Sequence, residues 1–454
     1  MNSNQASASG DGETRRAFIK KATTAAVAVG ATNIFKTPVY GQNQSPSPGR
    51  VIGANDRIVI GVIGTGKQGM THVRLNKENL SPNNVVFGAV CDLYQKHLNE
   101  AKKHAELADS NGYGDHRKLL ERKDIDAVIC APVDNWHAQV TLDALDAGKH
   151  VYCEKPMTRY VAESWAVYDA VKRSSKVYQC GSQYTADPMV HKAAEWIKAG
   201  KLGPLVWAQG SYCRNNKENS EWLFKPDDDA NPSNLDWDRW QGKAKKFPWD
   251  PRRYFSWHLY FDYNSGLLGN LLSHRFIPLM LATGNPEFPR RVCCTGTRKV
   301  STDREIPDTT HVLAEFPSGL TFVIVGSTVN EQGLPDMMRG RKGTLYMAAS
   351  QNKLELRPER ISADELDTAE FSDPAPFGKI ENLHKNFYDC IRNGGTPYCN
   401  ADLVVRANTV LCLAEMSERL NITVLFDEKT RTITTGGGKV IPPLSYDTVV
   451  PPST

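Results

Sequence analysis

Three glycines follow the first predicted strand, where a phosphate group can approach the backbone. The segment VIGVIGTGKQGMTHV places Gly64, Gly66 and Gly69 directly after a continuous β-branched run. A buried strand, a tight glycine turn and a helix N-terminus together form the pyrophosphate site of dinucleotide-binding folds. Gly64 permits the turn, Gly66 lets a pyrophosphate approach, and Gly69 allows the helix to pack closely. The residues predicted to contact the cofactor here are Gly64, Thr65, Gly66, Lys67, Gln68 and Gly69.

An acidic residue ends the second predicted strand. Asp92 closes the run VVFGAVCD. A carboxylate at this position hydrogen-bonds the ribose hydroxyls of NAD and repels the 2′-phosphate of NADP. The sequence therefore predicts NAD as the cofactor, with NADP less favoured.

The elements around these residues alternate between buried strands and helices. A strand, helix, strand order with apolar runs predicts a doubly wound parallel sheet, which we assign to residues 56–181. After it the alternation stops, and longer alternating strands predict a mostly antiparallel sheet packed on helices over residues 182–435. Two helices predicted to be amphipathic close this second domain, and residues 436–454 form a tail. The predicted strands of the first domain are RIVIGVIG, VVFGAVCD, IDAVICAP, KHVYCEKP and KVYQCGSQ.

The N-terminal region has the pattern of an export signal. TRRAFIKKATTAAVAVGA combines two adjacent arginines with a short apolar run, as in signals that the twin-arginine translocase recognises. We assign residues 1–41 to this signal and the polar residues 42–55 to a linker, and expect a periplasmic or secreted protein. The apolar run is shorter than the roughly 20 residues that span a bilayer. A basic helix start and an uncleaved anchor are the alternatives.

Composition narrows the class of protein. The net charge is only +4 over 454 residues, and most of the excess lies in the signal region, which argues against a nucleic-acid partner. The ten cysteines include no CxxC pair, so we expect free structural thiols and no metal site.

Three further segments, together with the glycine pattern, resemble the Gfo/Idh/MocA family of sugar oxidoreductases over residues 55–425. They are APVDNWHAQV, EKPMT and HKNFYDCIRNGGTP. The resemblance implies that Lys155 lies beside the nicotinamide and the substrate hydroxyl, and that Glu154 contacts the cofactor. It further implies that the nicotinamide ribose is lined by Pro132, Asn135 and His137.

The predicted chemistry is oxidation of a sugar alcohol, which needs a hydride acceptor and a group that takes the hydroxyl proton. Lys155, at a strand end in the crevice, can polarise the hydroxyl oxygen; a solvated surface lysine is the alternative. SGLLGNLLSHRFIP resembles the second catalytic element of the family, with His274 at the histidine position and Asn270 in place of the aspartate. Asn270 cannot ionise, so His274 is the predicted base or acid. Its alternative is a packed helix histidine.

Four more side chains are candidates for contacts with cofactor or substrate. Gln183 and Tyr184 follow the last strand of the first domain, and Trp257 and His258 lie in an aromatic-rich stretch. Flat aromatic faces suit sugar stacking, but core packing and subunit contacts explain them equally well.

Export would require the enzyme to carry its cofactor, because NAD is made inside the cell. We therefore expect tightly bound NAD and a redox-neutral cycle. The first hypothesis is an oxidoreductase acting on a carbohydrate or polyol hydroxyl. The alternatives are an NAD-dependent glycoside hydrolase working by transient oxidation and elimination, and a non-catalytic carbohydrate-binding protein. The second-domain sheet resembles the face through which family members pair, so we expect a homo-oligomer.

Overall fold

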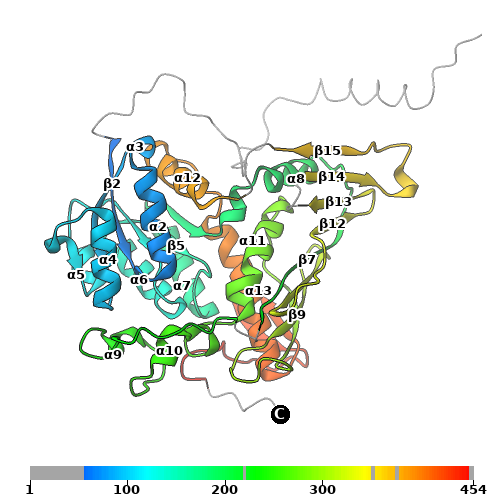
Figure 1. Cartoon of the computed structure of the whole chain (residues 1–454). Coiled ribbons are helices and arrows are strands. Elements are labelled where there is room, and N and C mark those ends of the chain that lie inside the picture. The colour runs from blue at the N-terminus through cyan, green and yellow to red at the C-terminus, as the bar shows by residue number, and fades with distance from the viewer. Residues whose placement is uncertain (1–55, 218–220, 349–352, 374–377, 449–454) are drawn as a thin grey trace, which may run out of the picture.

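The computed structural model describes residues 56–217, 221–348, 353–373 and 378–448 (Figure 1). The predicted signal and linker, residues 1–55, lie outside these described residues. Two sheets with helices between them make up the described fold. None of the helices in the described residues is long and apolar enough to cross a membrane.

The first sheet is six-stranded, in the order β3-β2-β1-β4-β5-β6. All neighbouring strands are parallel, and Ile63 at the end of β1 pairs with Cys91 of β2 and Cys130 of β4. The carboxyl ends of these strands therefore meet at one edge, where ligands bind in such sheets. The strands are β1 (Ile58–Ile63), β2 (Val85–Cys91), β3 (Gly112–Tyr113), β4 (Ala127–Cys130), β5 (His150–Glu154) and β6 (Tyr178–Gly181).

Helices cross over between these strands, as the parallel pairing requires. Their apolar faces pack on a core that includes Val73, Leu98 and Val140. The main crossover helices are α2 (Lys67–Glu78), α4 (Gln95–Ala105), α5 (His116–Leu120), α6 (Asp134–Asp146) and α7 (Val161–Arg173).

The second sheet is eleven-stranded and mostly antiparallel, with β7 and β10 as its parallel neighbours. The fold class predicted from the sequence is thus confirmed. The order is β15-β14-β13-β12-β7-β10-β9-β8-β16-β17, with β11 beside β7. The strands are β7 (Leu205–Asn215), β8 (Arg291–Thr297), β9 (Thr309–Glu315), β10 (Thr321–Ser327), β11 (Val329–Asn330), β12 (Met337–Gly340), β13 (Gly343–Ala348), β14 (Lys353–Pro358), β15 (Ala369–Ser372), β16 (Val424–Asp427) and β17 (Thr432–Thr435).

Helices α11 (Ser273–Ala282) and α13 (Ala401–Leu420) lie between the first domain and the large sheet (Figure 1). α13 contacts α7 on one side and β8 on the other, so it is buried on nearly every side. The expectation of an amphipathic helix is therefore wrong for α13. The same expectation is right for α12 (Ile380–Asn393), which presents one apolar face to α2 and β6. α8 (Pro188–Lys198) packs on α11.

A buried ion pair ties the two domains together. Arg159, next to the start of α7, donates to both carboxylate oxygens of Glu415 on α13, at 2.6 and 2.7 Å. The same guanidinium donates to the carbonyl of Phe261. The tail also returns to the first domain, since the Tyr446 hydroxyl lies 3.2 Å from the carbonyl of Asn135.

Candidate active site

The glycine turn is shaped by two close backbone approaches and one open space. Gly64 has φ +81°, and a Cβ there would lie 2.4 Å from the backbone nitrogen of Pro132. A Cβ on Gly69 would lie 1.8 Å from the carbonyl oxygen of Gly64. A Cβ on Gly66 would meet only His97, at 3.8 Å. Protein packing thus demands glycine at 64 and 69, whereas at 66 the space is open toward a ligand.

The N-terminus of α2 suits an anion. The helix begins after Gly66 with no side-chain cap and no acidic residue in its first turn. Its first backbone N–H groups therefore have no intrahelical partner and point toward the open space. Lys67 and Gln68, both exposed, lie in this turn. These residues fit a dinucleotide pyrophosphate.

Asp92 lies beside the same turn. Its Oδ2 accepts hydrogen bonds from the Thr65 backbone, at 2.6 Å, and from the Thr65 hydroxyl, at 3.2 Å. Its Oδ1 accepts from the Tyr94 backbone at 2.8 Å. Burial alone would lower the pKa of His97, but the hydrogen bond and charge of Asp92 outweigh burial and raise it. The carboxylate thereby holds the glycine turn against the end of β2, where a ribose would lie.

Residues 227–247, here called the strap, belong to the second domain but cover the carboxyl edge of the first. The strap contains α9 (Trp237–Trp240) and is followed by α10 (Pro251–Phe255); both lie along the first domain in Figure 1. Its backbone exchanges hydrogen bonds with the loop after β2, from Gln95 to Asn234 and from Asp236 to Leu93.

Side chains extend this attachment to two more strand ends. Arg239 donates to the carbonyl of Gly114, after β3, at 3.0 Å. At the start of α6, the Asn135 amide donates to the carbonyl of Gln241 and the Trp136 indole to that of Trp240. The strap is therefore bonded to the loops after β2, β3 and β4.

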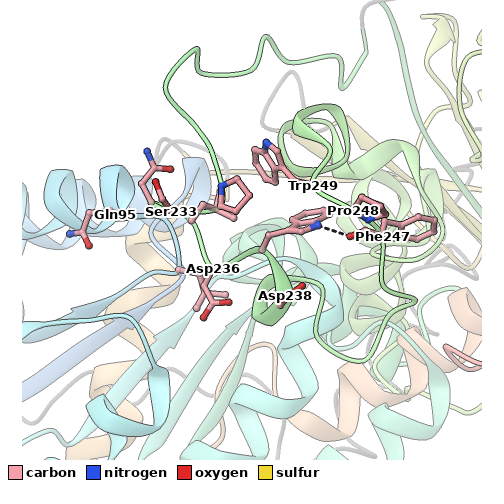
Figure 2. Close-up of a pocket in the computed structure, with 12 residues that line it drawn as sticks. Gln95, Ser233, Asp236, Asp238, Phe247, Pro248 and Trp249 are labelled. Carbon is pink, nitrogen blue, oxygen red and sulfur yellow. Dashed lines mark hydrogen bonds between the residues drawn. The ribbon is translucent and has the colours of Figure 1, made fainter.

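Two pockets adjoin the strap: one at the end of β2, here called the inner pocket, and one beside Trp249, here called the outer pocket. The inner one, of about 630 Å³, is lined by Asp92, Tyr113 and the strap residues Asp236 and Arg239. It continues from the predicted ribose position, so its size and place suit the adenosine half of a dinucleotide. Figure 2 shows the outer pocket, of about 620 Å³, in which Trp249 and Phe247 form part of the wall.

A buried chain of polar groups runs from α12 to Glu154. The Tyr388 hydroxyl donates to the Asn76 amide oxygen at 2.6 Å, and the Asn76 amide nitrogen lies 3.3 Å from His384 Nδ1. His384 Nε2 lies 2.9 Å from His72 Nδ1, and His72 Nε2 lies 2.8 Å from Glu154. Because the Asn76 nitrogen is a donor, each following group donates in turn toward Glu154.

This chain sets the charge of Glu154. Burial alone would raise the pKa of Glu154, but the hydrogen bond from His72 and the charge of Lys155 outweigh burial and lower it to about 2. Gln68 donates to the same carboxylate at 3.0 Å. Glu154 is therefore a fixed negative charge between the glycine turn and the lysine.

His137 is fully buried and joins two loops of the crevice. Its Nδ1 lies 2.7 Å from the carbonyl of Pro156, and its Nε2 lies 3.2 Å from that of Pro132. Carbonyls only accept hydrogen bonds, so the doubly protonated ring satisfies both. Burial alone would lower the pKa of His137, but Cys153 and Asp134 outweigh burial and raise it to about 10. The ring thus contacts the backbone behind the crevice.

Lys155 is half-buried, and its Nζ donates to the carbonyl of Asn270 at 3.0 Å. Asn270 lies in a π-helical turn, η6 (Leu268–Leu272), that continues into α11. π-turns of this kind are frequent at functional sites. The turn brings Lys155 from the first domain against the segment that carries His274.

His274 lies one turn after Asn270. Its Nδ1 is buried and has no hydrogen-bond partner among the described residues. The ring makes an edge contact with Tyr184, at 5.8 Å between centroids. Burial and the charge of Lys155 lower the pKa of His274 well below its ordinary value. The imidazole is therefore neutral near pH 7 and able to accept a proton.

His258 is a second neutral imidazole near the lysine. It lies between two tryptophan rings, 3.8 Å from Trp257 and 5.7 Å from Trp222. Burial, with the charges of Lys155 and Lys67, lowers the pKa of His258 to about 3. Its Nδ1 is likewise buried with no partner among the described residues.

Tyr184, another predicted site residue, lies beside His274. Gln183 and Tyr184 form a 3₁₀ turn, η3 (Gln183–Ala186), after β6, and Arg275 lies over the Tyr184 ring at 5.4 Å. No group of three or more His, Cys, Asp or Glu side chains suited to a metal ion occurs in the described parts of the chain.

A parallel sheet with a glycine turn, an acid after β2 and a strand-end lysine bonded to the π-turn before His274 is the arrangement expected of an NAD-binding oxidoreductase fold. Comparison with protein families agrees. Residues 58–182 match an oxidoreductase family described as an NAD-binding Rossmann fold, and residues 218–439 match its C-terminal alpha/beta domain. The chain belongs to the Gfo/Idh/MocA oxidoreductase family, and NAD is the cofactor of its first domain.

Curated relatives share part of the chain. A glycosyl hydrolase family 109 protein of Shewanella baltica (strain OS185) is 27% identical over 212 residues, 44% of this chain and 45% of the relative. Levoglucosan dehydrogenase of Pseudarthrobacter phenanthrenivorans is 35% identical over 105 residues, 23% of this chain and 27% of the relative. The matched segments span less than half of each relative.

Solved structures share the fold over most of the chain. A levoglucosan dehydrogenase in complex with NADH and levoglucosan has a TM-score of 0.61 at 18% identity, covering 84% of this chain and 99% of that one. An aldose-aldose oxidoreductase from Caulobacter crescentus in complex with glycerol has a TM-score of 0.61 at 19% identity, covering 82% and 100%.

Proposed function

We propose that the protein oxidises a hydroxyl group of a carbohydrate or polyol, using NAD that stays bound. One observation carries the proposal: at the carboxyl edge of an NAD-binding sheet, Lys155 donates to the carbonyl of Asn270, one helical turn before the neutral His274. NAD supplies the hydride acceptor. The names of the similar proteins, which act on or bind sugars and polyols, support this substrate class.

Residues of the chain perform the other steps of the proposed oxidation. Lys155 donates a hydrogen bond to the substrate oxygen and stabilises the negative charge that develops there. His274, neutral and without a protein partner at Nδ1, takes the hydroxyl proton. Glu154 is the fixed counter-charge of the lysine, and the strap forms one wall of the cofactor crevice.

The strap supports the proposal that NAD is retained. It is hydrogen-bonded to three strand-end loops, so the wall that Asp236 and Arg239 give to the inner pocket is held in place against the first domain. Retention is what an exported enzyme requires, and export through the twin-arginine translocase remains our proposal for residues 1–41. We also propose pairing through the second sheet, where Val206 and Leu313 are 51% and 48% exposed.

A glycoside hydrolase that oxidises, eliminates and re-reduces its substrate is the second candidate. The observation that favours it is the set of relatives named glycosyl hydrolase family 109 proteins and α-N-acetylgalactosaminidase. Chromogenic α-N-acetylgalactosaminides separate the two. Aglycone release without added NAD would favour hydrolysis, whereas a sugar-dependent rise in bound NADH without release would favour oxidation.

Retention is tested by native mass spectrometry of the purified protein, where we expect one dinucleotide per chain. Arg239→Ala removes the strap contact to Gly114 and should speed NAD loss by about tenfold, the effect of one charged hydrogen bond. Arg117→Ala is the matched control, because Arg117 also pairs with Asp115 but lies outside the strap. A protein that is purified empty and takes up no NAD would overturn the proposal.

A further inference from the structure

We propose that Asn270 is locked with its amide oxygen toward the substrate, where it accepts a hydrogen bond from a second hydroxyl beside the one that is oxidised. This inference rests on the proposed function and narrows its substrate class to sugars or polyols with a free vicinal diol. It also gives a physical reason for the asparagine at a position where the sequence resemblance implies aspartate.

The lock begins with Asn264, which is fully buried. Its amide nitrogen donates to the carbonyls of Trp257 and Tyr260, both at 2.9 Å. Its amide oxygen accepts from the backbone N–H of Gly266 at 2.6 Å. Two acceptors on one side and one donor on the other leave Asn264 a single orientation.

Asn264 then fixes Asn270. The side-chain atom of Asn270 that lies 3.1 Å from the Asn264 oxygen must be a donor, so it is Nδ2. A carboxylate at position 270 would place two acceptor oxygens in contact inside a buried turn, which is unfavourable. Residue 270 is therefore required to be an amide, and its Oδ1 faces away from Asn264.

Oδ1 of Asn270 belongs to the same π-turn that Lys155 contacts. The Asn270 main-chain carbonyl accepts from Lys155 Nζ at 3.0 Å, and His274 follows one turn later. Oδ1 of Asn270 has no hydrogen-bond partner among the described residues. An oxygen acceptor in this position binds a hydroxyl that donates to it.

That hydroxyl differs from the one that is oxidised. The reacting hydroxyl has a single proton, which must pass to His274 while its oxygen accepts from Lys155; bound NAD would supply the hydride acceptor. A proton held by Asn270 cannot make that transfer. Asn270 therefore binds the neighbouring hydroxyl of a vicinal pair and orients the reacting one.

The lock is tested without any substrate through Asn270→Asp. Because the buried carboxylate faces the Asn264 oxygen, we expect the midpoint of thermal unfolding at pH 7 to fall by about 2–4 °C, and the loss to shrink toward pH 4.5 as the acid is protonated. Asn99→Asp is the control, since this exposed amide oxygen already accepts from Gln95 and the charge change is the same. In the Asn264→Ala background the penalty of Asn270→Asp should disappear. An equal penalty in both backgrounds overturns the lock.

The diol proposal is tested with levoglucosan and its monodeoxy analogues. If levoglucosan is not oxidised, another sugar that the protein oxidises and its monodeoxy analogues take its place. Wild type should lose about 3- to 10-fold in kcat/KM on the analogue that lacks the neighbouring hydroxyl, as for one neutral hydrogen bond. Asn270→Ala should lose the same factor on the parent sugar, mainly in KM, and no longer distinguish the two. Unchanged discrimination in Asn270→Ala overturns the diol proposal, whereas absence of all sugar oxidation overturns the proposed function instead.

Discussion

The two halves of the crevice differ in how far the protein satisfies the ionisable side chains predicted to act there. On the cofactor half, Asp92, Glu154 and His137 each have hydrogen-bond partners in the chain, whereas the buried amide oxygen of Asn135 has none among the described residues. On the substrate half, His258 and His274 have buried ring nitrogens with no partner among the described residues.

The difference indicates that the cofactor half is already formed, whereas the substrate half lacks hydrogen-bond partners that a ligand can provide. Buried polar groups in native proteins are nearly always hydrogen-bonded, so unpaired ones indicate a missing partner. The cofactor half holds its shape through contacts within the chain, which suits a cofactor that stays bound. The substrate half keeps two buried ring nitrogens without a partner among the described residues, which suits the exchanging substrate that we propose.

The largest expected effect comes from removing the lysine at the junction of the halves. Lys155→Met keeps the apolar stem but removes the charge that we propose to polarise the substrate oxygen. We expect kcat to fall about 10²- to 10⁴-fold, the usual contribution of such a group, with bound NAD unchanged. Steady-state rates and native mass spectrometry check this. A variant that loses NAD to the same extent would show that the halves are not separate.

A smaller effect distinguishes packing from binding within the cofactor half. Gly69→Ala places a Cβ 1.8 Å from the Gly64 carbonyl oxygen, so it should cost about 1–3 kcal/mol of stability and weaken NAD binding. Gly66→Ala meets open space, so stability should stay within about 0.5 kcal/mol while NAD binding weakens. Chemical unfolding of the apo-protein and NAD titration measure both. Equal destabilisation of the two variants would contradict the open space at Gly66.

A third comparison is the pH dependence of the cofactor half. The pKa of His137 is raised to about 10 from its ordinary 6.5, so its stabilisation is complete below pH 6.5 and is lost as pH rises toward 10. The slope should not exceed about 1.4 kcal/mol per pH unit. His137→Gln should remove it, and Cys153→Ser should move it to lower pH, since Cys153 is the main group that raises this pKa. Urea unfolding across this range provides the measurement; identical slopes in wild type and His137→Gln would refute the charged ring.

The parallel sheet, the glycine turn and the acid after β2 were predictable because each has a local signature. A β-branched run, the spacing of Gly64, Gly66 and Gly69, and an aspartate at a strand end are all read from neighbouring residues. The same holds for Lys155, which ends a recognisable strand. The predicted roles of individual site residues remain predictions.

The rest depends on residues distant in sequence. Nothing local to His384 indicates that it bridges Asn76 and His72, because the contact joins positions 312 residues apart. The sequence of the strap indicates only a loop rich in aromatic residues. Its contacts could not be predicted, because its partners lie in three separate loops of the other domain. The π-turn at Leu268–Leu272 adds a residue that helical periodicity does not reveal. The Asn264–Asn270 pair was visible only as a departure from a motif.

A row of thiols crosses the first sheet near its ligand edge. Cys130 pairs in register with Cys153, and Cys153 with Cys180, and all ten cysteines of the chain are free. These three are fully buried, so no oxidant reaches them once the sheet has closed. A nascent chain meeting an oxidising compartment would instead cross-link them before the strands paired. Free thiols in protein recovered from an oxidising compartment would therefore show that the chain had folded before it was transported there.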